Sequence, residues 1–192
     1  FVERPIYEKF RDAFVAKTKQ LKIGNPNDAD TNLGAIVSKA HLEKVLSYVQ
    51  LAQEEGGTVL AGGNKVQLAG ELSDGYFMEP TIIEGLAFDC RTNQEEIFGP
   101  VVTIMPFDTE EEVTMMANST EYGLAATVWT QDVSKSTRLG ASLASGIVWI
   151  NCWLVRDLRT PFGGVKNSGV GREGGFNALN FFTEQTNVCI KL

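Results

Sequence analysis

Apolar side chains recur at helical spacing in the first part of the chain. Every fourth residue from Ile6 to Phe14 is apolar, which predicts an amphipathic helix over residues 6–20. Ser38 can cap a second helix, and Gly56 can end it. The apolar stripe of this second helix consists of Leu42, Val45, Leu46 and Val49. Both helices are therefore expected to present one face to a core.

Short β-type runs alternate with helical segments from residue 58 onward. We expect strands at 58–61, 80–84, 101–105, 125–130 and 147–150, and helices at 110–118, 132–145 and 173–181. Asp132 is expected to cap the second of these helices and Gly146 to stop it. Strands joined by helices through short links are typical of βαβ units. The expected fold is therefore α/β, a mainly parallel open sheet flanked by helices.

Ligands of such sheets bind beyond the carboxyl ends of the strands, so the segment after Ile150 is the expected place of chemistry. It contains Arg156 and Arg159, with Asp157 between them. Two interpretations stand. The arginines are solvated or paired with Asp157, or one of them lies at the rim of an active site and faces an anion.

The charge and the cysteine content narrow the function. With 17 Lys and Arg against 24 Asp and Glu, the net charge of −7 argues against broad binding of nucleic acids or anionic membranes, but it does not exclude an anionic substrate. No apolar run reaches the roughly 18–20 residues that cross a bilayer. The cysteines Cys90, Cys152 and Cys189 show no CxxC spacing, which predicts a reducing, cytoplasmic location without a disulfide framework or zinc site. His41 is the one histidine and leaves little material for a metal site.

The segment from Gly169 to Gly174 matches the GxGxxG pattern of dinucleotide-binding loops. That fingerprint requires a strand directly before it and an acidic residue about 20 positions later on a second strand. Here Lys166-Asn167-Ser168 precedes the motif, and only 18 residues follow Gly174. We therefore predict a structural glycine turn.

Two adjacent carboxylates, Glu95 and Glu96, precede Phe98 and a Gly-Pro pair at the start of a predicted strand. One interpretation is a loop whose acids face solvent and whose Phe98 fills the core. The other places one carboxylate where it accepts both hydroxyls of a ribose, with the aromatic side chain against an attached ring. The spacing alone does not decide between them.

Three segments resemble signature segments of the aldehyde dehydrogenase superfamily, in the family's order and spacing: 95–101, 161–166 and 168–173. Residues 25–26 and 75–81 add two weaker matches, so the resemblance covers essentially the whole chain. It identifies the chain as a C-terminal catalytic portion of such an enzyme. Residues 151–159 are most similar to the dehydrogenases of 2-aminomuconic and 2-hydroxymuconic semialdehyde.

The resemblance implies a cofactor site. Glu96 corresponds to the glutamate that holds the nicotinamide ribose, and Phe98 to the aromatic side chain beside the nicotinamide. His41 and Lys44 correspond, by a weaker alignment, to further contacts near that ribose. The implied cofactor is NAD. NADP is the alternative, because no matched segment contains the residues that read the adenosine ribose.

The resemblance also implies a substrate. Phe162 and Trp153 correspond to positions that line the substrate tunnel, and Arg156 stands where other members carry an apolar or aromatic residue. A lone charge in an apolar tunnel is costly, so Arg156 is expected to face a carboxylate of the substrate. The implied reaction oxidises a carboxylate-bearing semialdehyde of aromatic catabolism, such as 2-hydroxymuconic or 2-aminomuconic semialdehyde, to the acid. Betaine aldehyde or an aliphatic aldehyde is the alternative.

No catalytic residue is assigned within this chain. In the family, the nucleophilic cysteine and the general-base glutamate lie upstream of the position of Phe1, and Phe1-Val2 looks like the end of a strand already in progress. Residues 1–182 are therefore expected to form a catalytic domain that is incomplete on its N-terminal side. Residues 183–192 are expected to be an oligomerisation strand of a homodimer or homotetramer. The alternative is an inactive fragment that folds and self-associates.

Overall fold

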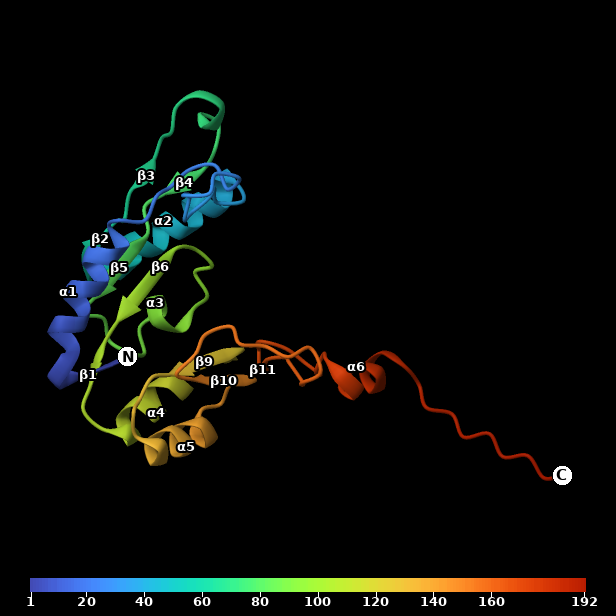
Figure 1. Cartoon of the computed structure of the whole chain (residues 1–192). Helices are drawn as coiled ribbons and strands as arrows, with labels where there is room; N and C mark the ends of the chain where they lie inside the picture. The colour runs from blue at the N-terminus through green and yellow to red at the C-terminus, as the bar shows by residue number, and fades with distance from the viewer. The chain divides into compact units, whose positions relative to one another are not determined.

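Residues 1–192 are described by a computed structural model, which shows two units (Figure 1). The first comprises Phe1–Val113 and the second Thr114–Leu192. The boundary falls within helix α4, Glu110–Asn118. No helix is both long enough and apolar enough to span a bilayer.

A three-stranded sheet organises the first unit. Its order is β2 (Thr58–Ala61), β5 (Thr81–Glu84), β6 (Val101–Ile104), with β5 antiparallel to β2 and parallel to β6. β5 is the central strand, and its Ile82 and Ile83 are fully buried. Because successive side chains of a strand point to opposite faces, these two isoleucines require cover on both sides of the sheet.

Two helices provide that cover. α1, Tyr7–Thr18, packs Phe14 against the cluster that contains Ile82, and α2, Lys39–Glu54, packs Ala52 against Ile83. The buried residues of α2 are Leu42, Val45, Val49 and Ala52. The predicted helices are confirmed, as is most of the predicted apolar stripe, of which only Leu46 is half-buried.

The other elements of the first unit are short. They are β1 (Val2–Glu3), parallel to β7 (Pro106–Phe107); β3 (Lys65–Val66), antiparallel to β4 (Phe77–Met78); the 3-10 helices η1 (Arg4–Ile6) and η2 (Gly70–Leu72); and α3 (Arg91–Gln94).

The second unit contains the predicted βαβ arrangement. β9 (Ala125–Val128) and β10 (Ile147–Ile150) are parallel and are joined by α5 (Val133–Ser142). β8 (Tyr122–Gly123) pairs antiparallel with β11 (Val165–Lys166), and α6 (Gly175–Phe182) follows. The α/β class is confirmed, with parallel and antiparallel pairs distributed over several short sheets.

Helix caps follow the sequence closely at the N-terminal ends. The side chain of Asp132 accepts a hydrogen bond from the backbone of Lys135 at 3.0 Å, as predicted. The prediction that Gly146 stops this helix is wrong, because α5 ends at Ser142. Gly146 instead allows a close chain crossing: a Cβ there would lie 1.7 Å from the carbonyl oxygen of Gly163.

The C-terminal tail, residues 183–192, forms neither helix nor strand in this chain and is exposed along its whole length. Figure 1 shows it leaving α6 as an extended trace. Its apolar members, Val188, Ile190 and Leu192, alternate along the backbone. Its pairing with another subunit stays a prediction.

Candidate functional site

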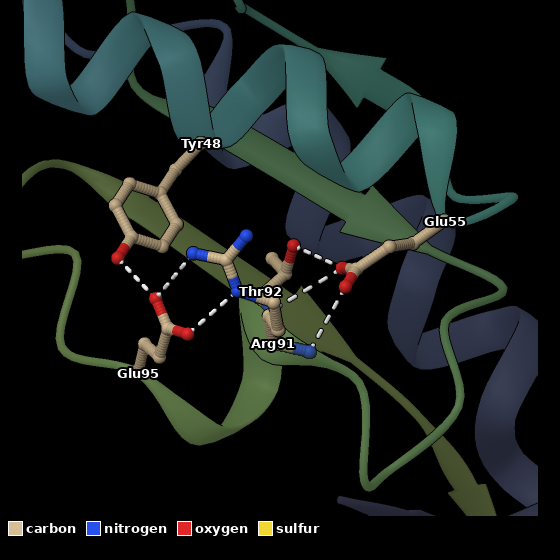
Figure 2. Close-up of polar contacts among 5 residues, drawn as sticks. All are labelled: Tyr48, Glu55, Arg91, Thr92 and Glu95. Atoms are coloured by element: carbon tan, nitrogen blue, oxygen red, sulfur yellow. Dashed lines mark hydrogen bonds and ion pairs between the residues drawn. The ribbon is translucent and has the colours of Figure 1, made fainter.

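The segment from Arg91 to Phe98, here called the α3 segment, carries the two adjacent carboxylates. Glu95 is fully engaged (Figure 2): Arg91 donates to it from Nε at 2.7 Å and from a terminal nitrogen at 3.1 Å, and the Tyr48 hydroxyl donates at 2.5 Å. The Arg91 hydrogen bond, followed by that of Tyr48, lowers the pKa of Glu95 from 4.5 to about 2. Glu95 is therefore ionised under all ordinary conditions and committed to structure.

The start of the α3 segment is held by Glu55, the residue that directly follows α2. Its carboxylate accepts from the backbone N–H of Arg91 at 2.9 Å, the N–H of Thr92 at 3.2 Å and the Thr92 hydroxyl at 2.6 Å (Figure 2). Burial opposes ionisation of this carboxyl group, but these hydrogen bonds outweigh burial and lower the pKa of Glu55. A carboxylate that is distant in sequence thus caps α3.

Glu96, unlike Glu95, has a side chain that no protein group binds. Its side chain is exposed and makes no hydrogen bond or ion pair, while its backbone carbonyl accepts from Lys44 Nζ at 3.0 Å. The interpretation in which both acids merely face solvent fails for Glu95 and holds for Glu96. The structure therefore identifies which of the two carboxylates is free to bind a ligand.

Phe98 does not fill the core. Its side chain is 74% exposed, and its φ of 60° places it in the left-handed region, which costs a residue with a side chain on the order of 1–3 kcal/mol. The Phe98 carbonyl accepts from His41 Nε2 at 2.7 Å, and the two rings meet edge to face with centroids 6.1 Å apart. Backbone strain of this kind persists only where surrounding contacts maintain it, and it clusters at functional sites.

The four predicted cofactor residues, His41, Lys44, Glu96 and Phe98, therefore lie together in the first unit. A free carboxylate accepts hydrogen bonds from both hydroxyls of a vicinal diol. An exposed aromatic side chain two residues later offers a surface to a flat ring. The arrangement fits a ribose that carries a planar base.

The substrate residues were predicted in the segment that follows β10, residues 151–162, here called the β10 segment. Asn151 ties the ends of β9 and β10 together: its side-chain oxygen accepts from the Thr130 N–H at 2.9 Å, and its side-chain nitrogen donates to the Thr130 carbonyl at 2.8 Å. Trp153 is 60% exposed and meets Trp149 edge to face at 5.0 Å. An open groove also lies here, lined by Trp129, Thr130, Gln131, Val133, Ser136 and Asn151. None of the predicted substrate residues lines that groove.

Arg156 has a partner within the chain. Its guanidinium forms an ion pair with Glu173 and lies 4.1 Å from the centroid of the Phe162 ring. Phe162 and Glu173 also exchange two backbone hydrogen bonds of 2.8 Å, which hold the pair in place. Arg156 therefore has a carboxylate partner that the sequence did not suggest, and its role in binding a substrate carboxylate stays a prediction. The alternative partner, Asp157, is bound by Arg159 instead.

Sequence reasoning missed Tyr48, Glu55 and Glu173 as parts of these sites. Tyr48 could have been found, because it lies one helical turn after Lys44 on the same face of α2. Glu55 and Glu173 carried no local signal for their partners.

The glycine motif acts as a structural turn. Gly171 and Gly174 have φ values of 75° and 93°, and a Cβ on Gly174 would lie 2.2 Å from the Thr160 carbonyl oxygen.

The three cysteines are free, and burial raises the pKa of Cys90. No group of three or more His, Cys, Asp or Glu side chains is arranged to hold a metal ion.

Comparison with known proteins gives a consistent result. A family model described as "Aldehyde dehydrogenase family" matches residues 1–188. The 2-aminomuconic semialdehyde dehydrogenase of Mus musculus is 52% identical over 100% of this chain and 40% of its own length. The 2-hydroxymuconic semialdehyde dehydrogenase of Pseudomonas sp. (strain CF600) is 50% identical over 100% of this chain and 40% of its own length.

Solved structures also resemble the chain. A double mutant of betaine aldehyde dehydrogenase from Staphylococcus aureus, in complex with NAD+, has a TM-score of 0.89 and 41% identity, covering 94% of this chain and 36% of that one. The chain therefore spans about two fifths of the length of the curated relatives it matches.

Proposed function

The chain belongs to the aldehyde dehydrogenase family, and on that premise we propose that it contributes a cofactor clamp and part of a substrate pocket to an enzyme that oxidises an aldehyde to a carboxylic acid. The observation that carries this proposal is the free carboxylate of Glu96 beside the exposed Phe98. His41 and Lys44 hold the backbone that presents both side chains.

The proposed cofactor is NAD, with NADP as the alternative. Glu96 would accept the two hydroxyls of the nicotinamide ribose, and Phe98 would limit the movement of the nicotinamide ring. Bound NAD supplies the hydride acceptor for the oxidation. The solved relative that contains NAD+ supports this choice.

The proposed substrate is a semialdehyde with a carboxylate at the end opposite the aldehyde, such as 2-hydroxymuconic or 2-aminomuconic semialdehyde. Arg156 would bind that carboxylate. Glu173 occupies only one terminal nitrogen of its guanidinium, so most of the five N–H donors remain for a ligand. The Phe162 ring lies against the guanidinium, with the Arg156 Cζ 4.1 Å from the ring centroid, and helps to hold it in place. The names of the relatives support this substrate class.

A neutral or cationic aldehyde is the second candidate, supported by the similarity to a betaine aldehyde dehydrogenase. We favour the semialdehyde, because a guanidinium attracts a carboxylate and repels the quaternary ammonium group of betaine aldehyde. Phe162 and Trp153 would line the pocket for either substrate.

The nucleophile and the general base are proposed to lie outside this chain. None of Cys90, Cys152 and Cys189 corresponds to the family's nucleophile, and Cys152 and Cys90 are partly buried. A cytoplasmic location also stays a prediction, based on cysteine usage.

The function is tested by NADH formation in the intact protein with 2-hydroxymuconic semialdehyde, 2-aminomuconic semialdehyde, betaine aldehyde and an aliphatic aldehyde. We expect the two semialdehydes to have the highest kcat/KM, and Cys152→Ala to retain activity. Preference for betaine aldehyde would refute the substrate class. An absence of oxidation of every aldehyde would refute the activity and favour the self-associating alternative.

The tail is proposed to join a neighbouring subunit as an added strand. A run of alternating, exposed apolar residues with unpaired backbone groups is an association site. Deleting residues 184–192 from the intact protein should shift it to a smaller oligomer in sedimentation velocity. An unchanged oligomer would remove this role.

A further inference from the structure

Polar contacts between α2 and the α3 segment follow one another in register. Each contact joins residues far apart in the sequence. His41, Lys44 and Tyr48 of α2 and Glu55, which directly follows the helix, are spaced by three, four and seven residues, as on one helix face. As α2 is followed forward, its partners run backward: His41 to Phe98, Lys44 to Glu96, Tyr48 to Glu95, and Glu55 to Thr92 and Arg91. The α3 segment is therefore laid antiparallel along one helix.

Glu95 is the junction of this arrangement (Figure 2). It receives Arg91 from α3 and Tyr48 from α2, so a single carboxylate joins both helices. His41 and Lys44 bind carbonyl oxygens of the backbone and leave the direction of individual side chains undetermined. The Glu95 contacts instead hold a side chain, and with it the rotation of the local backbone.

That rotation decides where Glu96 points. The backbone at Glu95 is extended, with φ of −98° and ψ of 149°. Neighbouring side chains in extended backbone leave on opposite sides. Because the Glu95 carboxylate is bound toward α2, the Glu96 side chain is directed away from it and into solvent, in agreement with its exposure.

We propose that Tyr48 and Arg91 are positioning residues for cofactor binding, which act by holding Glu95 on the α2 side of the chain and so presenting Glu96 on the other. This inference rests on the proposed function of Glu96 as the ribose carboxylate. It assigns a role in cofactor affinity to two residues that would not touch the cofactor.

The test uses Tyr48→Phe in the intact protein, because this change removes only the hydroxyl. The matched control is Tyr7→Phe: Tyr7 also donates its hydroxyl to a glutamate carboxylate, that of Glu84, at 3.0 Å in the same unit, but it packs against the core cluster that contains Ile82. NAD and AMP are the two binding probes, since AMP lacks the nicotinamide ribose. Calorimetric titration measures both, and thermal unfolding reports on the fold.

We expect Tyr48→Phe to weaken NAD binding by about 3- to 10-fold, part of the effect of a hydrogen bond to a charged group, and to leave AMP binding unchanged. Tyr7→Phe and Tyr48→Phe should lower the thermal midpoint by similar amounts. Tyr7→Phe should leave NAD binding within about twofold of the wild type. Arg91→Lys keeps the positive charge but loses the guanidinium that contacts Glu95 through two nitrogens. It should reproduce the Tyr48→Phe result. Equal NAD affinities for the Tyr48 and Tyr7 variants would overturn the inference, as would parallel losses of NAD and AMP binding.

A double-mutant cycle with Glu96→Gln separates the positioning role of Tyr48 from the ribose-binding role of Glu96. If Tyr48 acts through Glu96, Tyr48→Phe should have little further effect on NAD binding in the Glu96→Gln background. Additive losses would refute the positioning role and leave the ribose clamp intact. Unchanged NAD binding in Glu96→Gln alone would refute the ribose clamp itself.

Discussion

The α3 segment and the β10 segment both carry predicted ligand-binding side chains, but their anchors differ. The contacts from α2 to the α3 segment span 36 to 57 residues of sequence. Hydrogen bonds of the β10 segment span 2 residues for Arg159 and Asp157, 17 for Arg156 and Glu173, and 21 for Asn151 and Thr130. One segment is fixed against a helix distant in sequence, and the other is held by contacts of shorter sequence separation.

This difference separates two demands on the proposed enzyme. A cofactor common to many enzymes needs a carboxylate and a ring in one constant geometry, which contacts from a packed helix provide. A substrate pocket must differ between enzymes with different substrates, and a surface segment held by contacts of shorter sequence separation can change without disturbing a core. The predictions below test this contrast, from the largest expected effect to the smallest.

Replacing Arg156 by Ala should have the largest effect. We expect kcat/KM for a carboxylate-bearing semialdehyde to fall roughly 10- to 100-fold, on the order of 1.4–3 kcal/mol, and kcat/KM for a neutral aldehyde of similar length to change little. Arg159→Ala is the matched control, because it removes the same charge from the same segment, and Arg159 is highly exposed. Equal losses on both aldehydes would mean that Arg156 only supports the fold through Glu173.

Replacing Glu96 by Gln should affect the cofactor and spare the fold. The charge of the acceptor contributes about 1–1.5 kcal/mol beyond a neutral hydrogen bond, so the KM for NAD should rise or turnover should fall by roughly 5- to 15-fold. The thermal midpoint should stay constant, since the carboxylate has no protein partner. Glu43→Gln on the exposed surface of α2 is the control. Wild-type kinetics in the Glu96 variant would return this residue to a purely solvated role.

Substitutions of two further carboxylates compare directly how much the contacts of each segment contribute to stability. Glu55→Gln should destabilise the protein by about 1–2 kcal/mol in denaturant unfolding, because three donors from Arg91 and Thr92 lose an ionised acceptor. Asp157→Asn removes a carboxylate that also accepts several hydrogen bonds, but locally and at the surface, and should leave the unfolding midpoint nearly unchanged. Similar losses in both variants would contradict the contrast between the segments.

Acid should loosen the α3 segment in a defined pH range. The pKa of Glu95 is about 2 in the folded chain, below its ordinary value of 4.5, so its stabilising contribution is complete above pH 4.5 and is lost as the pH falls toward 2. The thermal midpoint of the wild type should therefore fall more steeply than that of Glu95→Gln over this range. Parallel curves for the two proteins would show that Glu95 contributes no pH-dependent stability.

Much of the fold could be predicted from local patterns. α1 and α2 follow the spacing of their apolar residues, and the Asp132 cap and the βαβ unit around α5 appear where predicted. These features depend on residues within about one helical turn or on the alternation of a strand, which a single sequence displays. The candidate residues themselves came from ordered motifs and their resemblance to a family.

The tertiary structure decided what each candidate residue is free to do. Glu95 and Glu96 are chemically identical neighbours, and only the approach of Tyr48 and Arg91 separates a structural carboxylate from a free one. The same holds for the exposed Phe98 and for the pairing of Arg156 with Glu173. Apart from Arg91, which lies four residues before Glu95, these partners are residues that folding brings from a distance within hydrogen-bonding range, and the local sequence does not identify them.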